Sequence, residues 1–159
     1  MARPSVNTPE RPPTALARPD LTSRADIVHL LTAFYAEALA DPLLGPVFAI
    51  AGLDLHRHLP QIGDFWERSL LGSGGYAGKP LAVHRHLHRL VPLTSAMFDR
   101  WLELWSEAVD ASFAGPVATL ATVLAGEVAK TLQAQLAGHP GLTIVGFPSP
   151  AQHADGGPR

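Results

Sequence analysis

The stretch PLAVHRHLHRL, at residues 80–90, places three histidines within five positions, and the large rings of the chain lie in the segments on either side of it. These rings form three groups: Phe34 with Tyr35, Phe65 with Trp66, and Trp101 with Trp105. Only 7% of the residues are aromatic, so this arrangement indicates that rings and imidazoles converge on one flat apolar ligand. Haem is the leading candidate, since a neutral imidazole can be its axial donor.

The segments around this stretch have the apolar spacing of helices. Large side chains recur three or four positions apart between Phe98 and Val109. Ser23 and Asp26 have capping-box spacing at the start of another such segment, and Asp41-Pro42 predicts its end. No run shows the strict alternation of a strand bounded by turns. The sequence therefore predicts an all-α fold.

The other helices can be placed by their prolines. One should begin between Asp54 and Pro60 and end at Leu71, with Pro60 in its first turn, where the missing N–H is tolerated. A short corner is expected at residues 43–48, and a final helix should begin at Gly115-Pro116. The predicted core face of that final helix is Val117, Leu120, Leu124, Val128, Leu132 and Leu136.

Composition limits the domain count and the classes of partner. The chain has 159 residues and a formal charge of −2, so we expect one domain and no nucleic-acid partner. We expect a disordered Pro-rich tail over residues 1–20, a folded domain over 21–137 and a flexible tail over 138–159. Because there is no cysteine, thiolate-bound zinc and covalently linked haem are excluded. No membrane span or secretion signal is evident, so we expect a cytoplasmic protein.

The three clustered histidines differ in direction. His84 and His88 are four positions apart and lie on the same face of a helix, whereas His86 points away from them. At most one of the three should therefore bind iron. Taken alone, such a tract is more often a solvated, weakly basic helix.

Four segments resemble the group III truncated haemoglobins. They are FYAEALADPLLGPVF at 34–48, IGDFWERSLLG at 62–72, YAGKPLAVH at 76–84 and FDRWLELW at 98–105. Their order and spacing are compatible with that family, and the resemblance covers about residues 24–136. It implies a truncated globin fold, a two-on-two helical sandwich around haem.

The resemblance also implies roles for individual residues. His84 matches the proximal iron ligand, Tyr35 the distal tyrosine, His58 a distal histidine and Trp101 a distal tryptophan. The residues implied to contact haem are Phe34, Phe48, His58, Ile62, Phe65, His84 and Trp101. The chain looks a few residues longer after His84 than the shortest family members, so His88 stays open as the alternative proximal ligand. The haem carboxylates could pair with Lys79, Arg85, Arg89 or Tyr76.

The donor groups indicate which gas ligands would suit the site. A tyrosine hydroxyl can donate or accept a hydrogen bond and an indole N–H can only donate, so Tyr35 and Trp101 suit a partly negative ligand. We therefore expect a non-covalent, b-type haem protein that binds dioxygen, nitric oxide or a related diatomic gas such as carbon monoxide. Redox chemistry of a peroxidase-like or nitric oxide dioxygenase-like kind, fed by an unidentified reductase, is a further expectation.

Two other functions compete with this one. A zinc hydrolase could use His84, His88 and a distant carboxylate, but no glutamate lies between the two histidines to act as general base. Alternatively, the chain could be a helical sensor or interaction domain without a cofactor, whose rings serve only as core.

Overall fold

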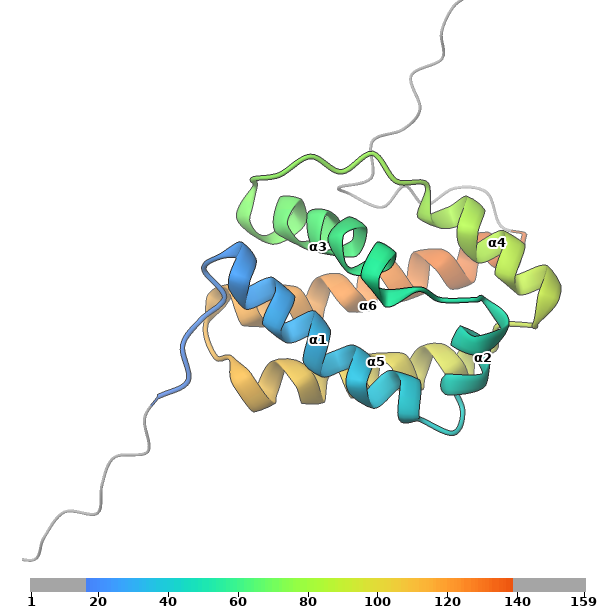
Figure 1. The fold of residues 1–159 in the computed structure, drawn as a ribbon, viewed down its shortest axis with the longest axis horizontal. Coiled ribbons are helices and arrows are strands. Elements are labelled where there is room, and N and C mark those ends of the chain that lie inside the picture. The colour runs from blue at the N-terminus through green and yellow to red at the C-terminus, as the bar shows by residue number, and fades with distance from the viewer. Residues whose placement is uncertain (1–16, 139–159) are drawn as a thin grey trace, which may run out of the picture.

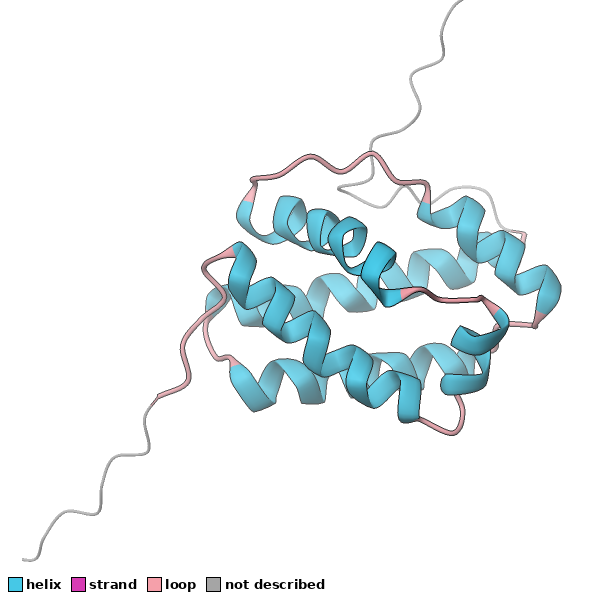
Figure 2. Cartoon of the chain, in the orientation of Figure 1, coloured by secondary structure: helices cyan, strands magenta, loops and turns pink. Residues whose placement is uncertain are grey.

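The computed structural model describes residues 17–138 as six helices joined by loops, and no strand occurs among these residues (Figure 2). The helices are α1 (Arg24–Ala40), α2 (Gly45–Ile50), α3 (Leu55–Leu71), α4 (Pro80–Leu90), α5 (Ser95–Ser112) and α6 (Pro116–Leu136). The all-α prediction is confirmed. Of the tails expected at residues 1–20 and 138–159, the parts at 1–16 and 139–159 lie outside the described residues. None of the six helices is long and apolar enough to cross a membrane.

Four of the helices form two layers. α1 and α3 pack side by side, α5 and α6 pack side by side, and the two pairs meet through α1 with α5 and α3 with α6 (Figure 1). α2 packs against α1, and α4 packs against α6 at one end of the sandwich. This arrangement is the two-on-two helical sandwich that the resemblance to group III truncated haemoglobins implies.

The centre of the core is a stack of aromatic rings. Trp66 from α3 and Trp105 from α5 are stacked with their centroids 4.3 Å apart, and Phe34 from α1 meets Trp105 edge-on at 5.4 Å. All three side chains are buried. The indole N–H of Trp105 donates to the carbonyl oxygen of Ala121 at 3.2 Å, so this large ring is held without an unsatisfied polar atom. The rings therefore join both layers of the sandwich.

The buried face of α6 differs from the predicted one. Its core positions are mainly alanines, at 118, 121, 125 and 129, whereas Leu120 is 44% exposed. Small side chains are needed there because the indole of Trp105 approaches the α6 backbone closely enough to bond Ala121. The predicted core face was therefore wrong at Leu120. The interface between α5 and α6 is filled by the large side chain of Trp105 from α5, and α6 contributes small side chains to it.

The position of Pro60 also differs from the prediction. α3 begins at Leu55, where the carboxylate of Asp54 accepts the N–H of His56 at 3.0 Å, so Pro60 lies in the second turn. A proline there removes the backbone bond to the carbonyl of His56. That carbonyl belongs to an exposed residue, so water can replace the lost donor. This exposure explains why the helix tolerates the proline.

The N-terminus of α6 is capped from a distant part of the chain. The carboxylate of Asp20 accepts the N–H groups of Val117 at 3.0 Å and Ala118 at 2.8 Å, and the carbonyl of Pro19 accepts the N–H of Ala114. Gly115 has φ of 150°, and a Cβ there would meet the Asp20 carboxylate. Pro19 and Asp20 thus belong to the folded body and not to the predicted tail, because they supply the acceptors that the end of α6 requires.

We expect Asp20→Ala to lower the free energy of unfolding by about 1–2 kcal/mol at neutral pH, the usual loss for a helix cap. Partial burial raises the pKa of Asp20, but the N–H groups of Val117, Ala118 and Leu21 outweigh it and hold that pKa below its usual value. A depressed carboxyl pKa stabilises the fold above the unfolded-state pKa, and this contribution disappears as the pH falls through the folded-state pKa. Urea unfolding should therefore show a difference in the free energy of unfolding between wild type and variant at pH 7, and this difference should disappear in acid. Asp99→Ala, which removes an exposed carboxylate, is the control. An equal difference in unfolding free energy at both pH values would contradict the role of the ionised Asp20 carboxylate as the cap of α6.

Candidate functional site

A cavity of about 270 Å³ lies among α1, α2, α3, α4, α5 and α6, on the α4 side of the aromatic stack. All eight residues that the sequence assigns to the site line it: Phe34, Tyr35, Phe48, His58, Ile62, Phe65, His84 and Trp101. The alternative histidine, His88, is not among the lining residues. The structure therefore brings together, in one largely apolar space, residues that are up to 67 positions apart in the chain.

His84 is held with one ring nitrogen fixed and the other free. Its Nδ1 lies 2.7 Å from the carbonyl oxygen of Pro80, one turn earlier on α4. Since a carbonyl can only accept, Nδ1 must carry the proton and Nε2 keeps its lone pair. Burial lowers the pKa of His84, and the bond to Pro80 opposes this only in part, so the ring is neutral at pH 7. A neutral imidazole with its second nitrogen oriented in this way is what a metal ligand requires.

His88 has the opposite arrangement. Its Nδ1 accepts the backbone N–H of Leu93 at 3.0 Å, beyond the end of α4. An accepting Nδ1 is unprotonated, so a neutral His88 carries its proton on Nε2 and has no second lone pair to offer. His86 is exposed, and its Nδ1 lies 3.4 Å from a guanidinium nitrogen of Arg89. Of the three clustered histidines, only His84 combines a place in the cavity with a free nitrogen donor.

Tyr35 of α1 and His58 of α3 form a pair where these two helices line the cavity. The phenol oxygen and the imidazole Nε2 are 2.7 Å apart, and the two rings meet edge-on at 5.4 Å. Burial raises the pKa of Tyr35, and both burial and repulsion by His84 lower the pKa of His58. Both groups are therefore neutral at pH 7. Either the phenol donates to Nε2, or a protonated Nε2 donates to the phenol and leaves the tyrosine proton for a ligand.

Aromatic rings form the wall next to this pair. Phe34 meets Tyr35 at 5.0 Å and Trp101 at 5.6 Å, while Phe48 meets Tyr35 at 6.0 Å, all edge-on. Trp101 also stacks on Trp105, with centroids 5.7 Å apart. These contacts fix the ring orientations, because edge-on and offset arrangements are the preferred ones. Among residues 17–138 the Trp101 indole N–H has no protein acceptor, unlike that of Trp105.

The corner that presents Phe48 is anchored by a buried carboxylate. Asp41, directly after α1, accepts the backbone N–H groups of Leu43 at 2.9 Å and Leu44 at 3.0 Å. Its other oxygen accepts from Arg100 of α5 at 2.8 Å, and this guanidinium holds the pKa of Asp41 below its usual range. The acid therefore remains ionised at pH 7 and ties α2 to the rest of the fold.

Several cavity residues are not among those that the sequence assigns to the site. They are aliphatic or sulfur-containing side chains that complete the walls, together with one further phenylalanine: Leu31, Leu44, Val47, Leu87, Leu93, Met97, Phe98, Val128 and Leu132. For Leu87 a local signal exists, because it lies three positions after His84 on the same helical face. The others have no sequence signal that separates them from ordinary core residues, since apolar residues of this kind line cores as often as ligand sites.

The four residues considered as partners for haem carboxylates are not equivalent. Tyr76 lines the cavity, and its ring lies 5.4 Å from that of Phe65. Lys79, Arg85 and Arg89 are exposed and are not among the lining residues. The arginines lie along α4, where Arg85 donates to the side chain of Gln135 at 3.4 Å.

The zinc alternative needs a third ligand beside His84 and His88. In the part of the chain that the structure describes, no three histidine, aspartate or glutamate side chains come together in a way that could hold a metal ion. Both histidines use Nδ1 for a hydrogen bond to the backbone, but His84 donates and His88 accepts, so in the neutral rings the free lone pair is on Nε2 of His84 only.

Comparison with known proteins agrees with this geometry. A family model described as bacterial-like globin matches residues 20–134. The group 3 truncated hemoglobin ctb of Campylobacter jejuni is 36% identical over 92 residues, which cover 55% of this chain and 70% of that protein. The crystal structure of group III truncated hemoglobin from Campylobacter jejuni matches with a TM-score of 0.67 and 29% identity, over 79% of this chain and 99% of that chain. The chain therefore belongs to the bacterial-like globin family, whose members bind haem and small gas ligands, and its resemblance within that family is to the group III truncated haemoglobins.

Proposed function

We propose that this globin binds haem b non-covalently, with Nε2 of His84 as the axial ligand. The observation that carries the proposal is the hydrogen bond from Nδ1 of His84 to Pro80, which leaves a free nitrogen donor on a side chain that lines the cavity. The walls fit the group as well, because aromatic and aliphatic side chains can cover an apolar ring system. No cysteine exists in the chain to form a thioether link, which supports the non-covalent form.

The gas ligand would occupy the half of the cavity that contains Tyr35, His58 and Trp101. Bound haem would supply an iron that can take a diatomic ligand, and His84 would hold that iron. The surrounding side chains then exclude water and offer hydrogen-bond donors to a partly negative ligand such as dioxygen. Several donors favour a ligand that is retained, and so favour redox detoxification of oxygen or nitrogen species, with electrons from a reductase, over rapid oxygen transport.

Titration of the purified protein with hemin tests the cofactor assignment. We expect uptake of one haem per chain, with an absorption spectrum that changes on reduction and again on addition of carbon monoxide. Unfolded protein and a folded helical protein of similar size serve as controls for non-specific hemin binding. A folded protein that stays colourless and takes up no hemin would instead favour the helical interaction domain without a cofactor.

A further inference from the structure

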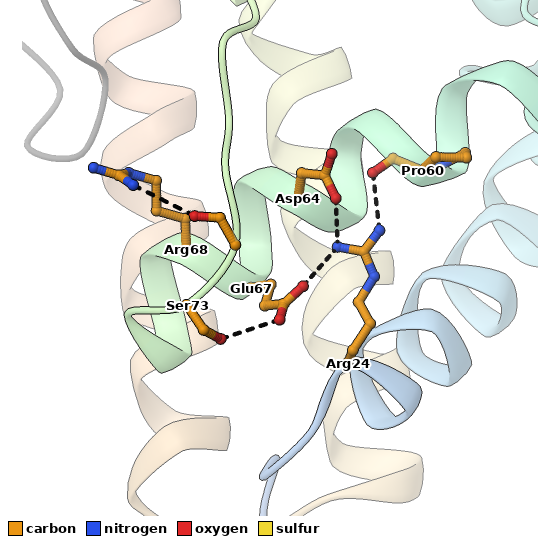
Figure 3. Close-up of polar contacts among 7 residues, drawn as sticks. Arg24, Pro60, Asp64, Glu67, Arg68 and Ser73 are labelled. Atoms are coloured by element: carbon orange, nitrogen blue, oxygen red, sulfur yellow. Dashed lines mark hydrogen bonds and ion pairs between the residues drawn. The ribbon is translucent and has the colours of Figure 1, made fainter.

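Arg24, the first residue of α1, reaches across to three groups on α3 (Figure 3). Its Nη1 lies 2.8 Å from Asp64 and 3.0 Å from Glu67, and its Nη2 donates to the carbonyl oxygen of Pro60 at 3.0 Å. The other oxygen of Glu67 accepts the hydroxyl of Ser73 at 3.0 Å. One guanidinium therefore fixes the position of α3 along and across α1. We call this set of contacts the Arg24 clamp.

A glycine in α3 makes room for the clamp. Gly63 is buried, and a Cβ built on it would lie 2.7 Å from Nη2 and 2.8 Å from Cζ of Arg24. Glycine inside a helix is destabilising relative to alanine. Its presence in the interior of α3 is therefore explained by the close approach of the guanidinium.

The clamp lies next to the weakest point of α3. Pro60 cannot donate a backbone hydrogen bond, so the first turn of the helix, which carries His58, is attached to the remainder by one bond fewer. The guanidinium bonds the carbonyl of Pro60 itself, two residues after His58. The Tyr35–His58 bond joins the same two helices at a second point. The position of His58 therefore depends on contacts made by α1 at both points.

We propose that Arg24 is a positioning residue for the distal side of the cavity, since it holds the first half of α3 where His58 can bond Tyr35. The ion pairs are partly exposed, with side-chain exposure of 33% for Arg24 and 42% for Asp64. Pairs of this kind contribute little to global stability, so the clamp acts mainly on geometry. This inference rests on the proposed function for its consequence, which is control of where His58 stands in the part of the cavity that a gas ligand would occupy.

Two variants break the clamp by different routes. Arg24→Ala removes the guanidinium. Gly63→Ala keeps every charge and improves helix propensity, but its Cβ displaces the guanidinium. The matched control is Arg57→Ala, which removes an 86% exposed arginine of α3 that pairs only loosely with Asp54, at 3.5 Å.

We expect both clamp variants to raise the bimolecular rate of carbon monoxide binding to the reduced haem protein by about 3- to 10-fold, the size of effect that a hydrogen bond has on an equilibrium. Arg57→Ala should leave the rate unchanged within error. In a His58→Leu background, Arg24→Ala should change the rate less than 2-fold, because the side chain that the clamp positions is gone. An equal increase in both backgrounds, or no increase in either, would overturn the proposal.

A measurement without haem separates this inference from the proposed function. In the cofactor-free protein, the ¹⁵N chemical shift of His58 Nε2 reports its hydrogen bond to Tyr35. We expect that shift to move toward the value of a solvated imidazole in Arg24→Ala and Gly63→Ala, and to stay in place in Arg57→Ala. A shift that stays in place in both clamp variants contradicts the role of Arg24. Failure to bind hemin would instead contradict the proposed function and leave this result interpretable.

Discussion

His84→Ala is expected to lose axial ligation of haem, whereas His88→Ala retains it. The reason lies in the ring nitrogens. His84 keeps a free Nε2 because Nδ1 donates to Pro80, while His88 uses Nδ1 to accept from Leu93. Removing His84 therefore deletes the donor itself, and no other histidine of α4 lines the cavity.

Absorption spectra of the reduced protein and its carbon monoxide complex distinguish the outcomes. His84→Ala should lose the bands of a histidine-ligated haem, and His84→Gly should recover them when free imidazole is added. His86→Ala, which changes an exposed residue of the same helix, is the control for general effects on α4. If His88→Ala loses the bands and His84→Ala keeps them, the axial assignment is wrong. Circular dichroism verifies that each variant remains helical.

Most of the helix ends could be predicted because their signals are local. Ser23 and Asp26 form the capping box that their spacing predicts, and α1 ends at Ala40, just before Asp41-Pro42. α6 begins at Pro116, as the pair Gly115-Pro116 predicts. In each case the residues that form the signal are within a few positions of the backbone groups that they affect, so a sequence pattern is sufficient.

Features that depend on partners far away in the chain could not be predicted. The carboxylate of Asp20 caps a helix that begins 96 residues later at Pro116, and Arg24 is matched to Gly63 through a gap that only the packed helices create. The alanine face of α6 is of the same kind, because Ala is buried or exposed according to what lies opposite. These long-range contacts cannot be inferred from residue type alone.

The candidate site could be predicted from the sequence only in part. The sequence assigns eight residues to the site; all but His58 lie in the four segments that resemble the family, and all eight line one cavity. The choice between His84 and His88 could not be made from spacing, because the two lie on the same helical face. It depends on which backbone group each Nδ1 meets, and Leu93 reaches His88 only through the turn that follows α4.

Tyr35→Phe and Trp101→Phe are each expected to speed dissociation of dioxygen from the reduced haem protein. Burial raises the pKa of Tyr35, so the phenol keeps its proton and can donate it, and the indole N–H of Trp101 has no competing acceptor among the described residues. A hydrogen bond to a charged group contributes about 1.5–3 kcal/mol, which corresponds to roughly a 10- to 100-fold change in rate. Stopped-flow displacement of dioxygen by carbon monoxide measures this rate directly.

Because Tyr35 is also bonded to His58, its removal has two effects that must be separated. His58→Leu removes the imidazole and leaves the phenol of Tyr35 in place. Without its hydrogen bond to the imidazole, the phenol should donate to the ligand at least as well as in wild type. Dissociation should then stay slow in His58→Leu but become fast in Tyr35→Phe and in the double variant. Tyr76→Phe removes the other phenol that lines the cavity, and we expect a smaller effect because its ring lies against Phe65 and not beside His58. Wild-type dissociation as fast as that of an oxygen-transport globin, and unchanged by Tyr35→Phe and Trp101→Phe, would show that these donors do not hold the ligand.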